Sequence, residues 1–177
     1  MFFLFLSTYL KQTVQYDLIN TFHFNNFKQI PKVQIIVLNF GYQKSNFKRL
    51  ISGLLALEFI TSKKGEITRS KHLNILLKIK QGSPVGCKIT LKKKIMYRFY
   101  LKLTTSIFPK LSIPKNTHFK QNYKSLSVVI QNPLIFMELE NHYEFFKDIP
   151  KLDITFITDS KSKNELSFLL KSIKIFL

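Results

Sequence analysis

Apolar and polar residues alternate along three stretches of the chain, a pattern that predicts β-strands with one buried face. These stretches are residues 85–92, 126–131 and 152–156. A fourth stretch, Val33 to Phe40, is apolar at nearly every position, which is typical of a strand buried on both faces. Residues 65–80 predict a further strand that leads into an extended arm.

Apolar residues at helical spacing predict helices over residues 45–61 and 95–108 and a last helix near the C-terminus. Ser45 is the expected N-cap of the first helix, and Ser160 or Ser162 that of the last. Pro109 is expected to end the second helix, because proline cannot continue one.

Strands and helices are mixed along the chain without strict alternation, and two of the strands have a polar face. We therefore predict an α+β fold, in which a largely antiparallel sheet has helices packed on one face and an open basic face on the other. Residues 1–30 would form an N-terminal helical segment, and residues 31–177 a single domain. Within that domain, residues 110–124 predict a loop and residues 134–146 a short helix.

Basic residues are concentrated in the first three quarters of the chain. The protein has 28 Lys and Arg against 10 Asp and Glu, a net charge of +18. Residues 1–137 hold 22 basic and three acidic residues, whereas residues 138–177 hold six lysines and seven acidic residues. Such an excess attracts polyanions, so nucleic acid is the leading partner class and an anionic membrane surface the second.

The composition also indicates where the protein is made. Lys, Asn, Ile and Phe abound while Ala56 is the one alanine, which is typical of a strongly AT-biased gene, as in many organellar genomes. Cys87 is the lone cysteine, so a reducing compartment is favoured. The run from Phe2 to Leu6 is far shorter than the roughly 20 residues that span a bilayer, and it lacks the flanks of a signal or transit peptide. We therefore expect synthesis inside the organelle.

Candidate catalytic motifs are weak. The stretch GSPVGCKIT (82–90) resembles a phosphate-binding loop, but the glycine spacing differs from the Walker pattern, Ile89 replaces the magnesium-binding hydroxyl and a strand follows. Cys87 could serve a small cysteine-dependent enzyme, yet the four histidines are scattered and no base pairs with it. We predict no catalytic residues, no cofactor and no metal site.

The polar face of the strand at 85–92 is the strongest binding signal. Lys88, Thr90 and Lys92 project from the face opposite Cys87, and nearby lysines and Arg69 extend the charge. Lysines and hydroxyls on an open sheet suit phosphate and 2′-hydroxyl contacts along an RNA minor groove. A plain solvent-facing strand is the alternative, and a basic peripheral membrane protein with a Phe-rich N-terminus is another.

Three stretches together resemble a known family. They are IPKVQIIVLNFG (30–41), GSPVGCKITLKKKIMYRF (82–99) and KLDITFITDSKSKNELSFLL (151–170). In order and approximate spacing they resemble the universal large-subunit ribosomal protein L-five, across about residues 28–174. The resemblance implies a structural protein of the large subunit that binds 5S rRNA and large-subunit rRNA in the central protuberance, beside neighbouring ribosomal proteins.

The resemblance also implies a site. The predicted rRNA-binding residues are Asn39, Lys63, Lys64, Thr68, Arg69, Lys88, Thr90, Lys92, Asn122 and Tyr123. The arm before Val85 is expected to reach the elbow of P-site tRNA with a tip formed by Lys78, Lys80, Gln81, Gly82 and Pro84. With the AT-biased composition, the predicted home is the ribosome of the mitochondrial matrix, organelle-encoded, with a plastid as the less favoured alternative and no membrane partner.

The chain departs from the family pattern at several positions. Lys63 replaces a usual glutamine and Glu66 an apolar residue. KQN (120–122) replaces a glycine-rich segment, and the loop 109–122 is several residues shorter than in the family. Since the family uses that region near the small-subunit head, contact with a head protein depends on whether the shorter loop still reaches it.

Overall fold

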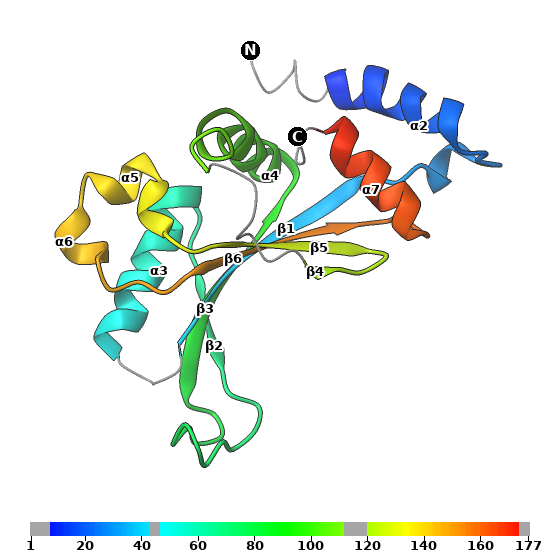
Figure 1. Ribbon diagram of the computed structural model, residues 1–177. Helices are drawn as coiled ribbons and strands as arrows, with labels where there is room; N and C mark the ends of the chain where they lie inside the picture. The colour runs from blue at the N-terminus through cyan, green and yellow to red at the C-terminus, as the bar shows by residue number, and fades with distance from the viewer. Residues whose placement is uncertain (1–7, 43–46, 112–119, 174–177) are drawn as a thin grey trace. The chain divides into compact units, whose positions relative to one another are not determined.

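The computed structural model describes residues 8–42, 47–111 and 120–173 (Figure 1). The strands are β1 (Val33–Gly41), β2 (Glu66–Arg69), β3 (Pro84–Lys92), β4 (Lys120–Gln121), β5 (Ser125–Ile130) and β6 (Leu152–Thr158). The α-helices are α2 (Gln15–Thr21), α3 (Phe47–Thr61), α4 (Lys93–Lys102), α5 (Met137–Glu140), α6 (Tyr143–Phe146) and α7 (Lys163–Ser172). Short π-helical turns at Leu10–Val14 and Leu103–Ile107 precede α2 and follow α4.

The strands form one sheet in the order β2-β3-β1-β6-β5-β4. β2 pairs with β3, and β4 with β5, in antiparallel register. The end of β6 meets the starts of its two neighbours, because Asp159 N–H donates to the Lys32 carbonyl (3.3 Å) and Thr158 N–H to the Lys124 carbonyl (2.8 Å). An end beside a start means antiparallel strands, so the predicted α+β fold with a largely antiparallel sheet is confirmed.

The chain packs as two compact units, each with segments from distant parts of the sequence. The central unit comprises Val37–Thr90 and Val129–Ile154. The terminal unit comprises Met1–Ile36, Leu91–Val128 and Thr155–Leu177. The division into residues 1–30 and one domain from residue 31 stays a prediction.

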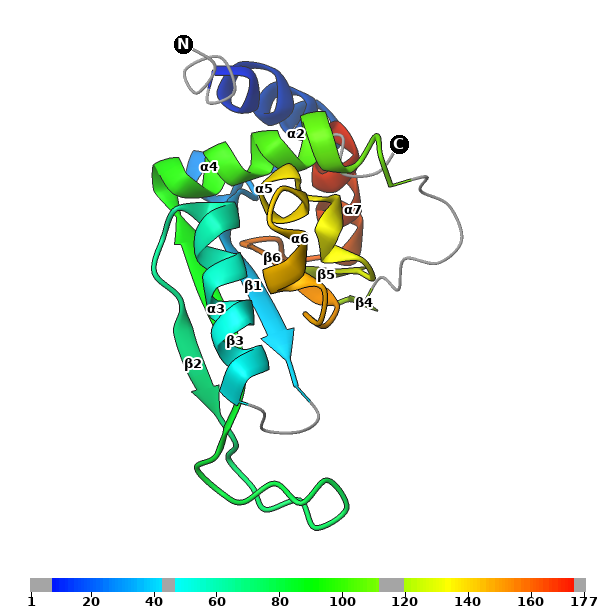
Figure 2. The same cartoon turned by 90° about the vertical axis from the view of Figure 1, so that its left-hand side faces the viewer.

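In the central unit, α3 covers one face of the β2–β3 hairpin (Figure 2). Its buried residues recur at helical spacing and include the small Gly53 and Ala56, which let the helix approach the strands closely. The Cys87 thiol of β3 contacts the helix directly and donates to the Leu50 carbonyl at 3.3 Å. The ring of Phe59 joins α3 to the following helices, with its centroid 5.8 Å from that of Phe146 in α6.

In the terminal unit, α7 is held at its C-terminal end by two tyrosines. Tyr100 of α4 donates its hydroxyl to the Ile173 carbonyl, and Tyr9 donates to the Ser172 carbonyl at 3.2 Å. The last carbonyls of a helix have no partner within the helix, so these bonds satisfy groups that would otherwise be unpaired. Burial raises the pKa of Tyr100, which keeps its hydroxyl protonated as a donor. Phe22 packs edge-to-face on Phe168 and attaches the segment after α2 to α7.

Several predicted boundaries shift, and one burial pattern is wrong. β1 is not buried on both faces: Ile36, Leu38 and Phe40 are buried, whereas the residues between them are half-buried, because helices cover only one face of the strand. The helix predicted over 95–108 begins two residues earlier, at Lys93, and is α-helical only to Lys102.

The structure also shows which residue caps α7 and how residues 134–146 fold. Ser162 caps α7 by accepting from the Glu165 N–H, whereas Ser160 is buried and bonds to Thr158 and the Tyr123 carbonyl. Residues 134–146, predicted to include a short helix, contain two, α5 and α6. The predicted cap Ser45 lies outside the described residues.

Close packing around Gly86 generates a stability prediction. A Cβ at this position would lie 2.6 Å from the Phe40 carbonyl oxygen and 2.7 Å from Thr68 Oγ1. We expect Gly86→Ala to lower the free energy of unfolding by about 1–3 kcal/mol, because strands in register cannot move apart to admit a methyl group. The midpoint of urea unfolding measures the effect.

Gly41→Ala is the matched control, since nothing lies within 4 Å of a Cβ there. That variant should change the free energy of unfolding by less than about 0.5 kcal/mol. Equal urea midpoints for the two variants would contradict the close packing of β3 against β1.

Candidate nucleic-acid interface

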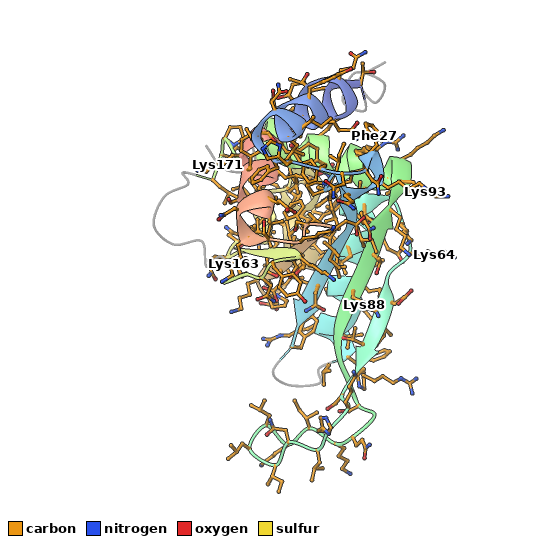
Figure 3. The ribbon with its side chains drawn as sticks, turned by 90° about the vertical axis from the view of Figure 1, so that its right-hand side faces the viewer. Phe27, Lys64, Lys88, Lys93, Lys163 and Lys171 are labelled. Carbon is orange, nitrogen blue, oxygen red and sulfur yellow. The ribbon has the colours of Figure 1, made fainter. Side chains whose placement is uncertain are left out.

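The register of β2 and β3 determines which side chains of the central unit face away from α3. Glu66 pairs with Lys88, Ile67 with Cys87 and Thr68 with Gly86. Because Cys87 points at α3, the neighbouring Lys88 points to the opposite face. Its side chain is 45% exposed (Figure 3), so the predicted lysine is not covered by the helices.

Asn39 lies on the same face as Lys88. The Tyr42 N–H donates to the Val85 carbonyl at 2.9 Å, and β1 neighbours β3 in the sheet. Counting back along the antiparallel pair from this bond places Asn39 across from Lys88. Asn39 is half-buried and therefore retains access to a ligand on this face.

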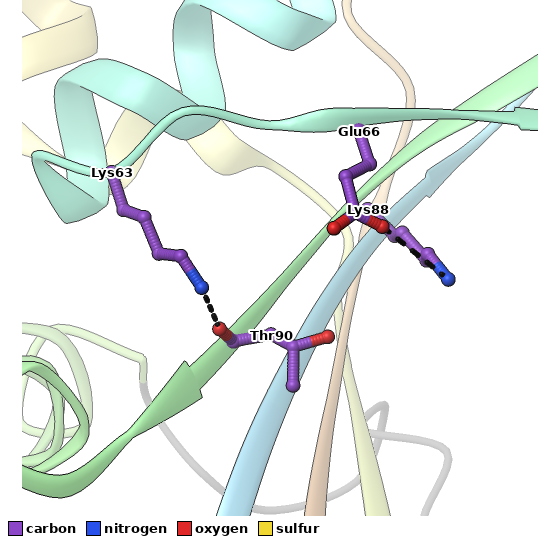
Figure 4. A network of polar contacts seen from close by, with 4 residues as sticks. All are labelled: Lys63, Glu66, Lys88 and Thr90. Carbon is purple, nitrogen blue, oxygen red and sulfur yellow. Dashed lines mark hydrogen bonds and ion pairs between the residues drawn. The ribbon is translucent and has the colours of Figure 1, made fainter.

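Two polar contacts beside β3 are drawn in Figure 4. Lys63 Nζ donates to the backbone carbonyl of Thr90 at 2.6 Å, which holds the lysine side chain beside the strand. Lys88 Nζ lies 3.6 Å from Glu66 Oε2, and the carboxylate side chain is 72% exposed. An ion pair this exposed stabilises the fold by at most about 1 kcal/mol, so a phosphate can replace the carboxylate at little cost.

The pairing of Glu66 with Lys88 was missed from the sequence. The sequence shows Glu66 only as an acidic residue at a position that is apolar in the family. Its role depends on strand register. Counting outward from the turn of the arm would place Glu66 opposite Cys87, because a β-bulge between Thr68 and Arg69 shifts the register by one residue.

The predicted rRNA-binding residues fall into two groups. Asn39, Lys63, Lys64, Thr68, Arg69, Lys88 and Thr90 belong to the central unit, where Lys63, Lys64 and Arg69 are exposed and Thr68 and Thr90 half-buried. Lys92, Asn122 and Tyr123 belong to the terminal unit, and all three are exposed. Lys92 ends β3 and Tyr123 precedes β5.

The arm between β2 and β3 forms a narrow, irregular hairpin whose tip differs from the one predicted. Asn74 and Ile79 exchange two backbone bonds of 2.9 Å, and the chain reverses at residues 75–78. Lys78 lies in this reversal with φ at 52°, so it is at the tip. Gln81, Gly82 and Pro84 lie instead at the base, where the Gly82 N–H donates to the Ser70 carbonyl.

The tip also exposes apolar side chains that were not predicted as part of the site. Leu76 is 95% exposed and Ile75 80% exposed. The sequence signal for these side chains is a run of apolar residues between lysines. From the sequence, that run is predicted only as part of the extended arm.

The enzymatic alternatives find no support in the described residues. Burial raises the pKa of the Cys87 thiol to about 11, so at neutral pH it is protonated and a poor nucleophile. The strand continues past Lys88 to Lys92, without the helix start that a phosphate-binding loop needs. No group of three potential metal ligands occurs in the part of the chain that the structure describes.

The membrane alternative is tested only in part. Among the described residues, no helix is both long and apolar enough to cross a bilayer. The N-terminal segment on which a peripheral mode would depend includes residues 1–7, which lie outside the described residues.

Comparisons with known proteins point to one family. Residues 84–176 match the model of the C-terminus of the ribosomal L-five family. The chain is 32% identical over 174 residues to the large ribosomal subunit protein uL5m of Reclinomonas americana, covering 96% of each. It is 34% identical over 164 residues to uL5 of Wigglesworthia glossinidia brevipalpis, covering 90% of this chain and 91% of the relative.

These matches, together with an α+β fold built on an antiparallel sheet, define a ribosomal protein. The chain belongs to the ribosomal L-five family. Its role is that of a structural component of the ribosome, not of an enzyme.

Proposed function

We propose that the protein anchors 5S rRNA, or the RNA that replaces it, to the large subunit of the mitochondrial ribosome and contacts P-site tRNA. The observation that carries the rRNA part is the face of the central unit opposite α3. Lys88 and Thr90 of β3 lie there with Asn39 of β1, next to the exposed Lys63 and Lys64. Ammonium groups would neutralise phosphates, while hydroxyl and amide groups would bond to 2′-hydroxyls in a shallow minor groove.

The tRNA part rests on the arm. Lys78 at its tip and Lys80 beside it are exposed, as are the apolar Ile75 and Leu76. Lysines would approach phosphates, and the apolar side chains would lie against the bases and riboses exposed where a folded RNA bends. The elbow of P-site tRNA is such a bend.

The mitochondrial and organelle-encoded origin rests on the AT-biased composition and on the likeness to the uL5m of Reclinomonas americana. Neighbouring proteins of the central protuberance would be its protein partners. A protein of the small-subunit head would be a further partner.

Sedimentation of a tagged, full-length protein from a mitochondrial lysate tests the assignment. We expect the protein to sediment with the large subunit and to shift to the top of the gradient after ribonuclease treatment, because RNA phosphates hold it there. A protein that sediments alone, or with membranes after ribonuclease, would contradict the proposal.

Lys88→Ala tests the proposed rRNA face. We expect weaker binding to a 5S rRNA transcript and a fall of about one unit in the slope of log affinity against log salt, because one phosphate contact is lost.

Glu66→Gln should raise affinity for the same transcript by up to about five-fold, since it removes the carboxylate that competes for the Lys88 ammonium.

Lys147→Ala is the matched control, because this exposed lysine follows α6 in the same unit but lies outside β2 and β3. It should leave the salt slope of 5S rRNA binding close to that of the unchanged protein. If Lys88→Ala and Lys147→Ala weaken binding equally, the RNA recognises net charge and not this face.

A double variant, Lys78→Ala with Lys80→Ala, tests the arm. Ribosomes that carry it should release P-site tRNA about two- to five-fold faster, since two exposed phosphate contacts are removed. Binding to the 5S rRNA transcript should be unchanged. Unchanged tRNA release, measured by filter binding over time, would remove the tRNA contact from the proposal.

A further inference from the structure

Two exposed aromatic rings in the terminal unit each have a lysine beside them. Phe27 is 64% exposed, and Lys32 Nζ lies 5.4 Å from the centroid of its ring. Tyr123 is 54% exposed, and Lys124 Nζ lies 5.4 Å from its centroid. Both distances fall within the range of cation–π attraction, so each lysine is held near its ring.

The end of β6 lies between the backbones of the two lysines. The Lys32 carbonyl accepts from the Asp159 N–H at 3.3 Å, and the Lys124 carbonyl accepts from the Thr158 N–H at 2.8 Å. The Ser160 hydroxyl donates to the Tyr123 carbonyl at 2.5 Å. Because β1 and β5 flank β6 in the sheet, Lys32 and Lys124 lie on either side of the end of β6, each with its ring beside it.

The charge around this strand end is positive. Lys28 lies four residues before Lys32 in the chain, and Lys161 and Lys163 follow the end of β6. All three are exposed. The nearby lysines outnumber the two nearby carboxylates: Asp159, which accepts from the Gln34 amide, and Glu165, which accepts from the Lys161 N–H at 2.9 Å.

Rings this exposed contribute little to a core, and a ring with an adjacent ammonium can bind a nucleotide in two ways. Every base has a flat face that stacks on an aromatic ring, and its phosphate attracts the ammonium group. We propose that the surface formed by these two pairs beside the end of β6, called the edge from here on, binds unpaired nucleotides of RNA. Bases would stack on Phe27 and Tyr123, and Lys32 and Lys124 would contact phosphates. For the source of those nucleotides the inference rests on the proposed function. Tyr123 is one of the predicted rRNA-binding residues; the inference gives its ring a stacking role and adds Phe27, Lys32 and Lys124.

Binding of the full-length protein to a single-stranded RNA of about twelve nucleotides that contains 2-aminopurine tests the edge. The unchanged protein should quench the fluorescent base on binding. Phe27→Ala and Tyr123→Ala should each weaken binding about five- to twenty-fold and reduce the quenching, without changing the salt slope, because each removes one stacked base. Lys32→Ala and Lys124→Ala should each lower the salt slope by about 0.7, the value for one phosphate of a single strand.

Tyr16→Ala is the control for loss of an exposed ring, since Tyr16 is also 64% exposed but lies on α2. It should bind like the unchanged protein, and Phe27→Tyr should keep both affinity and quenching, which separates stacking from a folding defect. Equal losses for Tyr16→Ala and Phe27→Ala, or unchanged affinity in both ring variants, would overturn the inference.

Two further results separate this inference from the proposed function. If the ring variants bind single-stranded RNA normally while Lys88→Ala still weakens 5S rRNA binding, the edge is not an RNA site and the proposed function stands. If vesicles of phosphatidylcholine and phosphatidylserine retain the protein through Phe27 and Tyr123 and RNA does not, the edge is a lipid-binding surface and the inference is overturned.

Discussion

The packing of α3 against one face of β3 determines which groups of the central unit can meet a ligand. Cys87 and Ile89 are buried on that face, and removing them from water stabilises the fold. A strand alternates its side chains, so the same packing directs Lys88 and Thr90 to the other side. A shift of one residue in register would bury the lysine and expose the thiol, which makes the binding face a direct consequence of the core.

The charge of the protein fits a role inside an RNA assembly. A net charge of +18 on 177 residues repels itself in the isolated chain, and RNA phosphates relieve that repulsion on binding. The face near Lys88 is partly neutralised by Glu66 in the free protein, through an ion pair that remains in water. The protein can therefore exchange one exposed partner for another without unburying any apolar surface.

Chemically, the two units offer RNA different surfaces. The central unit presents lysines, hydroxyls and an amide along flat strands, which suits the backbone and minor groove of a duplex. The terminal unit presents exposed rings with neighbouring lysines at the end of β6, which suits bases that are not paired. Ribosomal RNA contains both kinds of segment, so both surfaces agree with membership in this family.

The sequence alone determined the fold class, most strands and helices, and the polar face of β3, because period-two and helical patterns depend on local burial that each segment encodes. Alternation along β3 and resemblance to a family also predicted Lys88, Thr90 and Asn39 as binding residues. The tertiary structure decided what depends on partners distant in the chain: the pairing of Glu66 with Lys88, the half-buried face of β1, the position of Lys78 rather than Gly82 at the tip of the arm, and the placement of Lys32 and Lys124 on either side of the end of β6. Register, turn position and strand order are set by contacts between segments, and no local pattern contains them.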